Sequence, residues 1–427
     1  MSVTDELRQI AVGNRQSEQH NQCAVRLRAA IFVVGSEKIM SDSVYQQGNA
    51  SLNNASDQFS DNPFPLFQQM RAIGPIVPMP SSYGTTMWMI TRMDEGIQVL
   101  KDAQRFTVDP RTVAVDDPKK RRSMDQMATG GFFGGPSMLD VDEPDHARLR
   151  TLVSKAFTPR YIEGLRPRIQ SLADELLDQV QDQGEIDLVS DFAYPLPINV
   201  ICDILGVPPN ERDQIGYSSY LDRLVRNKRA TPQDDLISQL VRIEEEGDRL
   251  SEAELRGMVG LLIFAGHETT SNLIGNGTVA LLDNPDQMAR LKADPSLIAS
   301  AVEELLRYSA PVVTPIPRFA REDVQIGGQT IHKGDVVLVA IASANRDEGQ
   351  FDDPEELDLA RQVNKHIAFG QGIHYCLGAP LARLEGQIAF TTLLRRMPNL
   401  RLNVPRSHLV WRGGMNLRGL VSLPVAF

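Results

Sequence analysis

Cysteine is scarce in this 427-residue chain, which contains three: Cys23, Cys202 and Cys376. Three cysteines so far apart cannot supply a disulfide framework or a zinc site built from several thiolates. Unpaired cysteines suit a reducing cytosol, where a single thiol can serve as a metal ligand or a nucleophile. We therefore expect a cytoplasmic protein in which Cys376 needs an explanation of its own.

Excess positive charge and long apolar runs are also lacking. The 44 Lys and Arg residues are outnumbered by 55 Asp and Glu residues, for a net charge of -11. This balance argues against a nucleic-acid binder, which would depend on a basic surface. No apolar run approaches the roughly 20 residues needed to cross a bilayer. The favoured class is a soluble enzyme that acts on a small molecule, without nucleic acid or membrane as a partner.

The sequence shows no internal repeats, Ser/Gly linkers or low-complexity tracts. Residues 40–427 are therefore predicted to form a single domain that is rich in helix. Residues 1–39 are polar around one short apolar patch and precede a second methionine, so we interpret them as an extension outside the fold. Periodicity predicts helices over 162–181, 251–282, 294–308 and 377–396, and strands over 87–91, 324–326 and 336–340.

The stretch 251–282 is the longest expected helix and contains no proline. It starts with a capping-box pattern, Ser251 followed by Glu254. At 1.5 Å per residue it would extend about 45 Å. Its apolar middle carries a polar group of residues, Gly266 to Thr270. Taken alone, this group favours a core helix that reaches the surface, or hydroxyls bonded back to the preceding turn, over a reactive site.

Cys376 stands in the decapeptide FGQGIHYCLG, immediately before a helical pattern. A helix N-terminus stabilises an anion, so we expect this position to lower the pKa of the thiol. The glycines of the decapeptide allow the backbone to lie flat against a broad group. A cysteine protease would need a base that His374 is badly placed to be, and zinc would need more ligands. A thiolate ligand to haem iron needs one cysteine, glycines and a helix start.

The decapeptide resembles the haem-binding signature of the cytochrome P450 family, which it matches at Phe369, Gly370, Gly372, His374, Cys376 and Gly378. Three further segments resemble family motifs in the same order along the chain: HARLR at 146–150, AGHETT at 265–270 and EELLR at 303–307. The resemblance extends from Asp145 to near Leu420, in the style of soluble bacterial members. It implies a mainly α fold with small β-sheets and haem between the long central helix and the helix that follows the cysteine.

The resemblance implies the cofactor-binding residues as well. Cys376 would be the thiolate ligand of the iron in haem b, in a loop with Phe369 against the sulfur and with Gly370 and Gly378. The two haem propionates would be held by four basic side chains, those of His146, Arg150, Arg318 and His374. Glu304 and Arg307 would form a structural brace with a third residue, which we predict to be Arg346.

On the distal side, the resemblance gives the polar group of the long helix a second interpretation. Ala265 and Gly266 would leave space for dioxygen. Thr269 would donate a hydrogen bond to that dioxygen, and Glu268 would relay protons through water. The positions that line the substrate pocket in relatives correspond here to a largely apolar set: Phe133, Val313, Thr314 and Met415.

The implied reaction inserts one oxygen atom from O2 into a hydrophobic small molecule, by hydroxylation or epoxidation. No glycine-rich nucleotide fingerprint follows a strand, so we expect a separate ferredoxin or flavodoxin with its reductase to supply electrons to a monomeric enzyme. The intact Glu268 and Thr269 favour this oxidoreductase over relatives that use hydrogen peroxide directly. A macrolide, terpenoid, steroid or fatty acid substrate is compatible with the pocket.

The segment before the long helix departs from the family pattern. In relatives, two helices and a loop roof the substrate pocket, but 21 residues separate Asp213 from Asp235 here. Because an average helix has about 11–12 residues, the region around 214–233 is predicted to hold one helix, over 215–229. The alternative function is therefore a non-catalytic or poorly active protein that binds haem or another ligand. The intact Glu268 and Thr269 count against this alternative.

Overall fold

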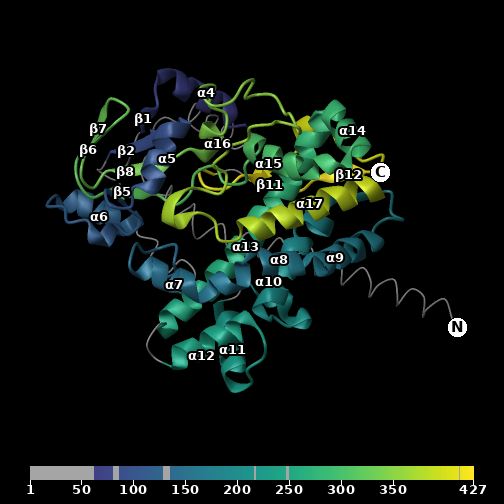
Figure 1. Ribbon diagram of the computed structural model, residues 1–427, viewed down its shortest axis with the longest axis horizontal. Helices are drawn as coiled ribbons and strands as arrows, with labels where there is room; N and C mark the ends of the chain where they lie inside the picture. The colour runs from purple at the N-terminus through teal and green to yellow at the C-terminus, as the bar shows by residue number, and fades with distance from the viewer. Residues whose placement is uncertain (1–61, 80–85, 128–134, 216–217, 247–249, 413) are drawn as a thin grey trace.

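The computed structural model of the chain describes residues 62–79, 86–127, 135–215, 218–246, 250–412 and 414–427 (Figure 1). The predicted extension, 1–39, and Phe133 of the predicted substrate pocket lie outside the described residues. Helices dominate, and the sheets are small, as the resemblance implied. In the described part of the chain, no helix is both long enough and apolar enough to span a membrane.

The helices form most of the body in Figure 1. In chain order they are α4 (Phe64–Ile73), α5 (Met93–Lys101), α6 (Pro118–Met127), α7 (Asp145–Ser154), α8 (Pro159–Gly164), α9 (Arg166–Asp178), α10 (Pro195–Leu205), α11 (Ser218–Ala230), α12 (Leu236–Glu245), α13 (Glu252–Asp283), α14 (Pro285–Ala293), α15 (Ile298–Tyr308), α16 (Ile341–Ala344) and α17 (Ala379–Arg396).

The strands are short. They are β1 (Ile76–Met79), β2 (Met87–Ile90), β3 (Phe106–Thr107), β4 (Glu185–Asp187), β5 (Arg318–Ala320), β6 (Val324–Ile326), β7 (Gln329–Ile331), β8 (Val336–Val339), β9 (Arg401–Leu402), β10 (Trp411–Arg412), β11 (Gly419–Leu420) and β12 (Pro424–Ala426). Five of them form a sheet in the order β1-β2-β8-β5-β3, and β4, β12 and β9 form a second sheet. Two hairpins, β6–β7 and β10–β11, complete the strand pairings.

Helix α13 is the central element and packs against α10, α15, α17 and β11. Its 32 residues begin with the predicted capping box, in which Ser251 and Glu254 bond to each other's backbone amides. Gly266 lies where α10 crosses, because a Cβ at this position would be 2.5 Å from Ile201 Cγ1. The small size of Gly266 therefore serves helix packing, and the expectation that it leaves space for dioxygen stays a prediction.

The predicted helices and strands match the observed ones, with one break and one late start. Within the stretch predicted as helix over 294–308, α15 begins at Ile298, after a 3-10 turn over Pro295–Leu297. The stretch predicted as one helix over 162–181 is divided between α8 and α9, because Pro167 in the first turn of α9 cannot donate a backbone hydrogen bond to the preceding turn. Strand β6 has its predicted bounds, and β2 and β8 each end one residue earlier than predicted.

One helix, α11, lies between Asp213 and Asp235 in the described residues. It is followed by α12 and then by α13, and α11 and α12 lie together at the lower edge of the molecule in Figure 1. Lys228 of α11 forms a buried ion pair with Asp235, 2.5 Å from Nζ to Oδ2, which joins the end of α11 to the start of α12.

Candidate functional site

The loop that carries Cys376 is held by left-handed glycines. Gly370 and Gly372 have φ angles of 71° and 73°, which strongly favour residues without a Cβ. A Cβ on Gly372 would also lie 2.4 Å from the carbonyl oxygen of Leu100. The Cys376 amide donates to the Phe369 carbonyl oxygen at 2.9 Å, which closes the loop just before α17 begins at Ala379.

The surroundings of the Cys376 sulfur act on the pKa of its thiol in two opposite directions. Burial raises the pKa of this thiol above its ordinary value, and the Gly378 and Ala379 amides and the charges of Arg150 and Arg383 only partly offset that increase. The amides at the start of α17 thus lower the pKa of the thiol, as predicted, but burial outweighs them and the net pKa in the protein alone is raised. The thiol of a half-buried cysteine that needs a further positive charge in order to ionise is suited to a metal ligand.

Four basic side chains gather beside this loop, as the resemblance implied. The rings of His146 and His374 lie 4.5 Å apart, edge to face. Arg150 donates to the Ile373 carbonyl oxygen at 3.4 Å, and Arg318, which is nearly buried, donates to that of Ile316 at 3.0 Å. Burial lowers the pKa of Arg318 to about 10, so this guanidinium is still a cation at neutral pH.

His374 supplies the observation that tests the fit of haem. Its Nε2 is buried without a hydrogen-bond partner among the described residues, and Asp142 Oδ1 is 4.0 Å away. Burial lowers the pKa of His374 to about 4, so the ring is neutral at physiological pH and can carry one N–H donor. An unpartnered ring nitrogen beside two half-buried or buried arginines fits the carboxylates of haem, and the adjacent sulfur fits its iron.

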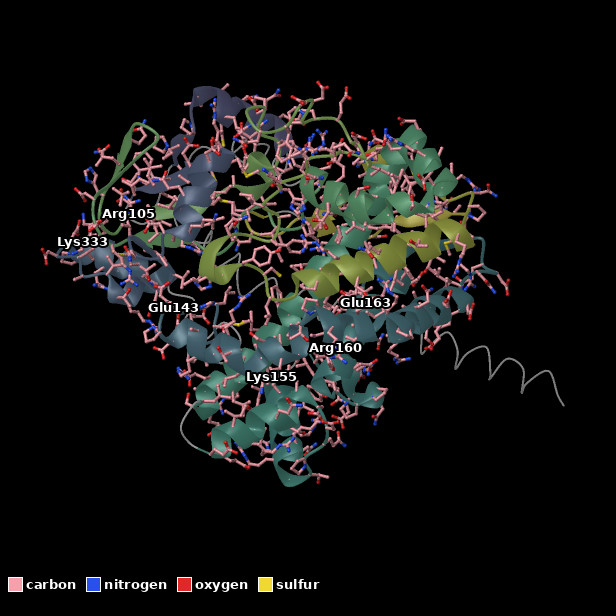
Figure 2. The ribbon with its side chains drawn as sticks, viewed as in Figure 1. Arg105, Glu143, Lys155, Arg160, Glu163 and Lys333 are labelled. Atoms are coloured by element: carbon pink, nitrogen blue, oxygen red, sulfur yellow. The ribbon has the colours of Figure 1, made fainter. Side chains whose placement is uncertain are left out.

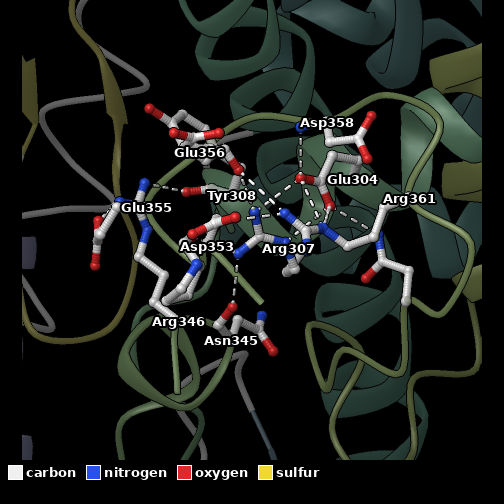
Figure 3. Close-up of polar contacts among 12 residues, drawn as sticks. Glu304, Arg307, Tyr308, Asn345, Arg346, Asp353, Glu355, Glu356, Asp358 and Arg361 are labelled. Atoms are coloured by element: carbon white, nitrogen blue, oxygen red, sulfur yellow. Dashed lines mark hydrogen bonds and ion pairs between the residues drawn. The ribbon is translucent and has the colours of Figure 1, made fainter. Parts of the chain in front are cut away.

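The predicted brace centres on Glu304, whose side chain is fully buried (Figure 3). Its two carboxylate oxygens accept from Arg307 Nη2 at 2.7 Å and Arg307 Nε at 2.8 Å. Arg307 also donates to three backbone carbonyls, those of Asn345, Pro354 and Glu356. The pair therefore fastens α15 to the chain that leads to the Cys376 loop.

The third member of the brace is Arg361, so the assignment of Arg346 was wrong. Arg361 Nε lies 3.2 Å and 3.3 Å from the two Glu304 carboxylate oxygens, and Asn364 donates to the same carboxylate at 2.9 Å. Arg346 instead pairs with Glu355 and donates to the Tyr308 carbonyl oxygen (Figure 3). Both arginines lie between the brace helix and the signature, so sequence order offered no basis for choosing between them.

On α13, the side chains of the predicted acid and alcohol pair are both bonded to protein. The Thr269 hydroxyl donates to the Ala265 carbonyl oxygen at 3.1 Å, the bond to the preceding turn considered from the sequence. Glu268 Oε1 lies 2.8 Å from Arg412 Nη1 on β10. Arg412 also donates to the Leu420 carbonyl oxygen and to Asn272 Oδ1. Sequence reasoning missed Arg412, because no spacing relates it to Glu268.

The described residues of the predicted substrate pocket lie near one another. The Val313 amide donates to the Asn416 carbonyl oxygen at 2.8 Å, and the Thr314 hydroxyl donates to the Met415 carbonyl oxygen. Val313 and Thr314 are buried, whereas Met415 is partly exposed and packs on the same apolar cluster as Val313. The structure thus brings two chain segments about 100 residues apart into contact.

The comparisons with known proteins all indicate the same family. The sequence model of the family described as cytochrome P450 matches residues 211–399. Cytochrome P450 107B1 from Saccharopolyspora erythraea is 43% identical over 392 residues, covering 86% of this chain and 96% of that protein. The 6-deoxyerythronolide B hydroxylase of the same organism is 39% identical over 403 residues, covering 87% and 97%.

A solved structure shows the same likeness in three dimensions. It is the crystal structure of a myxobacterial cytochrome P450, CYP267B1, in complex with myristic acid. It matches this chain with a TM-score of 0.82 at 38% sequence identity, covering 88% of this chain and 99% of that chain.

Proposed function

This chain belongs to the cytochrome P450 family and is a P450 monooxygenase, and from that premise we propose which residues carry its chemistry. Cys376 is the thiolate ligand of haem b, and His146, Arg150, Arg318 and His374 hold the propionates. Glu268 and Thr269 deliver protons on the distal side. The enzyme inserts one oxygen atom from O2 into a hydrophobic small molecule by hydroxylation or epoxidation.

One observation supports this assignment above the others. The Cys376 loop places a thiol close enough to Arg150 for their charges to interact, and two residues before the cysteine His374 has a buried ring nitrogen with no hydrogen-bond partner in the described part of the chain. When bound, haem supplies the iron at which dioxygen is reduced and its O–O bond is cleaved, with electron donation from the thiolate. The charge of the iron also stabilises that thiolate in its buried position.

The protein's own distal groups must change partners in order to act. The Thr269 hydroxyl donates to Ala265, so it must turn away from this carbonyl oxygen to donate a hydrogen bond elsewhere. The Glu268 carboxylate binds Arg412 through Oε1, so it takes a proton from solvent and passes it inward either through Oε2 or after it separates from Arg412. Arg412 is thus a positioning residue that holds Glu268 between turnovers.

Electrons reach the enzyme from a separate ferredoxin or flavodoxin. Such a donor needs a docking face close to Cys376, and α8, which packs against α17, offers positive groups there. Two such groups are exposed: Lys155 in the turn that follows α7, and Arg160 on α8 itself (Figure 2). Their charge suits an acidic partner, because opposite charges steer association between proteins.

The substrate class stays broad because the relatives differ in what they bind. One is named for hydroxylating 6-deoxyerythronolide B, and the myxobacterial structure contains myristic acid. The buried Val313 and partly buried Met415 support an apolar substrate for this chain.

The test of the ligand assignment is the reduced, carbon-monoxide-bound absorption spectrum of the purified full chain. We expect a thiolate-type spectrum for the wild type and its loss in Cys376→His, because imidazole donates less charge to iron than thiolate does. Cys202→Ala is the matched control. Cys202 is buried on α10, where burial raises its pKa to about 12, so its removal should leave the spectrum unchanged.

An unchanged spectrum in Cys376→His would overturn the ligand assignment. A loss of the thiolate spectrum in Cys202→Ala as well would show that the signal depends on general folding. Haem content, measured on the same samples, separates loss of the cofactor from a change of its ligand.

A further inference from the structure

Glu303 precedes the brace residue Glu304 in the EELLR motif but has a different set of partners. Its carboxylate oxygens lie 2.6 Å from Arg383 Nε and 2.9 Å from Arg383 Nη2, a two-point ion pair between α15 and α17. His366 Nε2 lies 3.1 Å from the same carboxylate. The His366 Nδ1 accepts from the Ala368 amide, which leaves Nε2 to donate to Glu303.

Arg383 connects this carboxylate to the Cys376 loop. Its guanidinium carbon lies 4.4 Å from the centre of the Phe369 ring, and its Nη1 lies 3.4 Å from the Tyr375 hydroxyl. Phe369 in turn accepts the Cys376 amide through its carbonyl oxygen. Arg383 is also close enough to Cys376 for its charge to act on the sulfur.

The contacts therefore form a continuous series from His366 through Glu303, Arg383 and Phe369 to Cys376. The side chains of Glu303 and Arg383 are about one-third exposed or less, at 27% and 31%. Solvent therefore screens the charges of this pair only in part. The two opposite charges also occupy different positions in the series, with Arg383 nearer to Cys376 than Glu303 is. The positive charge of Arg383 should therefore favour negative charge at the sulfur, and the negative charge of Glu303 should oppose it.

We propose that the Glu303–Arg383 ion pair sets the reduction potential of the metal centre at Cys376, with Arg383 raising the potential and Glu303 lowering it. The proposal rests on the proposed haem-thiolate function. The reaction concerned is the transfer of one electron from the ferredoxin or flavodoxin, which is oxidised, to ferric iron, which becomes ferrous. This transfer adds one negative charge at the site, which a nearby guanidinium favours and a nearby carboxylate opposes.

The test is a potentiometric titration of the haem-loaded full chain with a chemical reductant, followed by absorbance. Glu303→Gln should shift the midpoint potential to a more positive value, because Arg383 then acts without its counter-charge. Arg383→Gln should shift it to a more negative value. The double variant should lie between the two single variants, and Arg383→Lys, which keeps the charge, should lie closer to the wild type than Arg383→Gln does.

Arg395→Gln is the matched control. Arg395 lies on the same helix, α17, and pairs with Asp174 at 3.1 Å, but it is more exposed than Arg383 and belongs to the C-terminal end of the helix. We expect the Glu303 and Arg383 shifts to exceed the shift in this control. A general effect of removing one arginine from α17 would move Arg383→Gln and Arg395→Gln alike.

The carbon monoxide spectrum of each sample separates this inference from the function on which it rests. A wild type without a thiolate-type spectrum would overturn the proposed function and, with it, this inference. A normal spectrum, combined with shifts of equal sign or with no shift in the two single variants, would overturn the inference alone. Variants that lose the thiolate spectrum together with their haem, including Arg383→Lys, would likewise count against it and indicate a purely structural pair.

Discussion

Thr269 and Glu268 each make a contact within the protein that would be replaced by another during catalysis. The Thr269 hydroxyl donates to a backbone carbonyl one turn earlier, and Glu268 is paired with Arg412. The two contacts differ in how readily they break, because a hydroxyl rotates freely whereas the Glu268–Arg412 pair is largely buried, at 12% and 14% exposure, and solvent screens it little. The functional question at this scale is whether these side chains leave their present partners during turnover.

The first prediction concerns the hydroxyl. Thr269→Ala should leave haem content unchanged but divert electrons into hydrogen peroxide, because the distal site loses a hydrogen-bond donor. Peroxide released per NAD(P)H consumed, measured with surrogate redox partners, should rise several-fold. Thr278→Ala is the matched control, because the Thr278 hydroxyl makes the same bond to the Ile274 carbonyl oxygen further along α13. Equal peroxide yields in both variants would show that Thr269 is only structural.

The second prediction concerns the brace. A double-mutant cycle between Glu304→Gln and Arg361→Ala should give a coupling free energy of about 1–3 kcal/mol, because the two side chains share a buried, charge-assisted contact. The corresponding cycle between Glu304→Gln and Arg346→Ala should give a coupling within about 0.5 kcal/mol. Free energies of unfolding from urea titrations supply both values. A larger coupling free energy for the Glu304/Arg346 cycle than for the Glu304/Arg361 cycle would show that Arg346 belongs to the brace.

At the scale of elements, α13 and α17 enclose the site between them, and their contact contains a buried acid. Glu385 on α17 is fully buried near Thr270 on α13. Burial raises the pKa of Glu385 to about 8, against which the Thr270 hydroxyl acts only weakly. The interface between the two helices therefore carries a carboxyl group that is protonated at neutral pH.

The third prediction follows from this raised pKa. Between pH 4.5 and 8 the unfolded chain releases the Glu385 proton while the folded chain keeps it, so this group makes the free energy of unfolding fall as pH rises. Glu385→Gln should remove this slope. Its stability relative to wild type should increase from pH 5.5 to pH 8, by at most about 3 kcal/mol.

Urea unfolding of both proteins at the two pH values measures this change. Glu163→Gln is a suitable control, because Glu163 is an exposed carboxylate on α8. A stability difference between wild type and Glu385→Gln that is independent of pH would show that Glu385 is ionised in the folded protein.

In the whole molecule, the segment expected to roof the distal pocket, 214–233, is short. One helix, α11, is described between Asp213 and Asp235, and α12 then leads into α13. A haem pocket needs a cover that excludes water and holds an apolar substrate. We propose that the roof of this pocket is shortened, with α11 as its single rod, which at 13 residues is about 20 Å long.

The fourth prediction is that the distal pocket is more open to solvent than in relatives. Titrations followed by the haem Soret band should show weak binding of small hydrophobic ligands, and NAD(P)H consumption should couple poorly to product. Haem ligation should be intact, because the residues proposed to hold haem lie outside 214–233. Submicromolar affinity for a compact apolar ligand together with tight coupling would contradict the prediction and show that another segment completes the roof.

The sequence by itself determined the features that depend on near neighbours in the chain. The glycines of FGQGIHYCLG, the Ser251–Glu254 capping box and the Glu304–Arg307 pair each lie within ten residues, so spacing on a turn or helix decides their contacts. The helical periods predicted α13 and α17 to within two or three residues for the same reason. These local patterns carried the family resemblance and the proposed iron ligand.

The tertiary structure alone decided the contacts between distant segments. Arg361 reaches Glu304 from 57 residues away, and Arg412 reaches Glu268 from another element, so no local spacing could have selected them. It also decided the balance at Cys376, where burial outweighs the helix N-terminus and raises the pKa of the thiol. Burial and long-range pairing depend on which surfaces meet after folding, and the free energy of an ionised group depends on both.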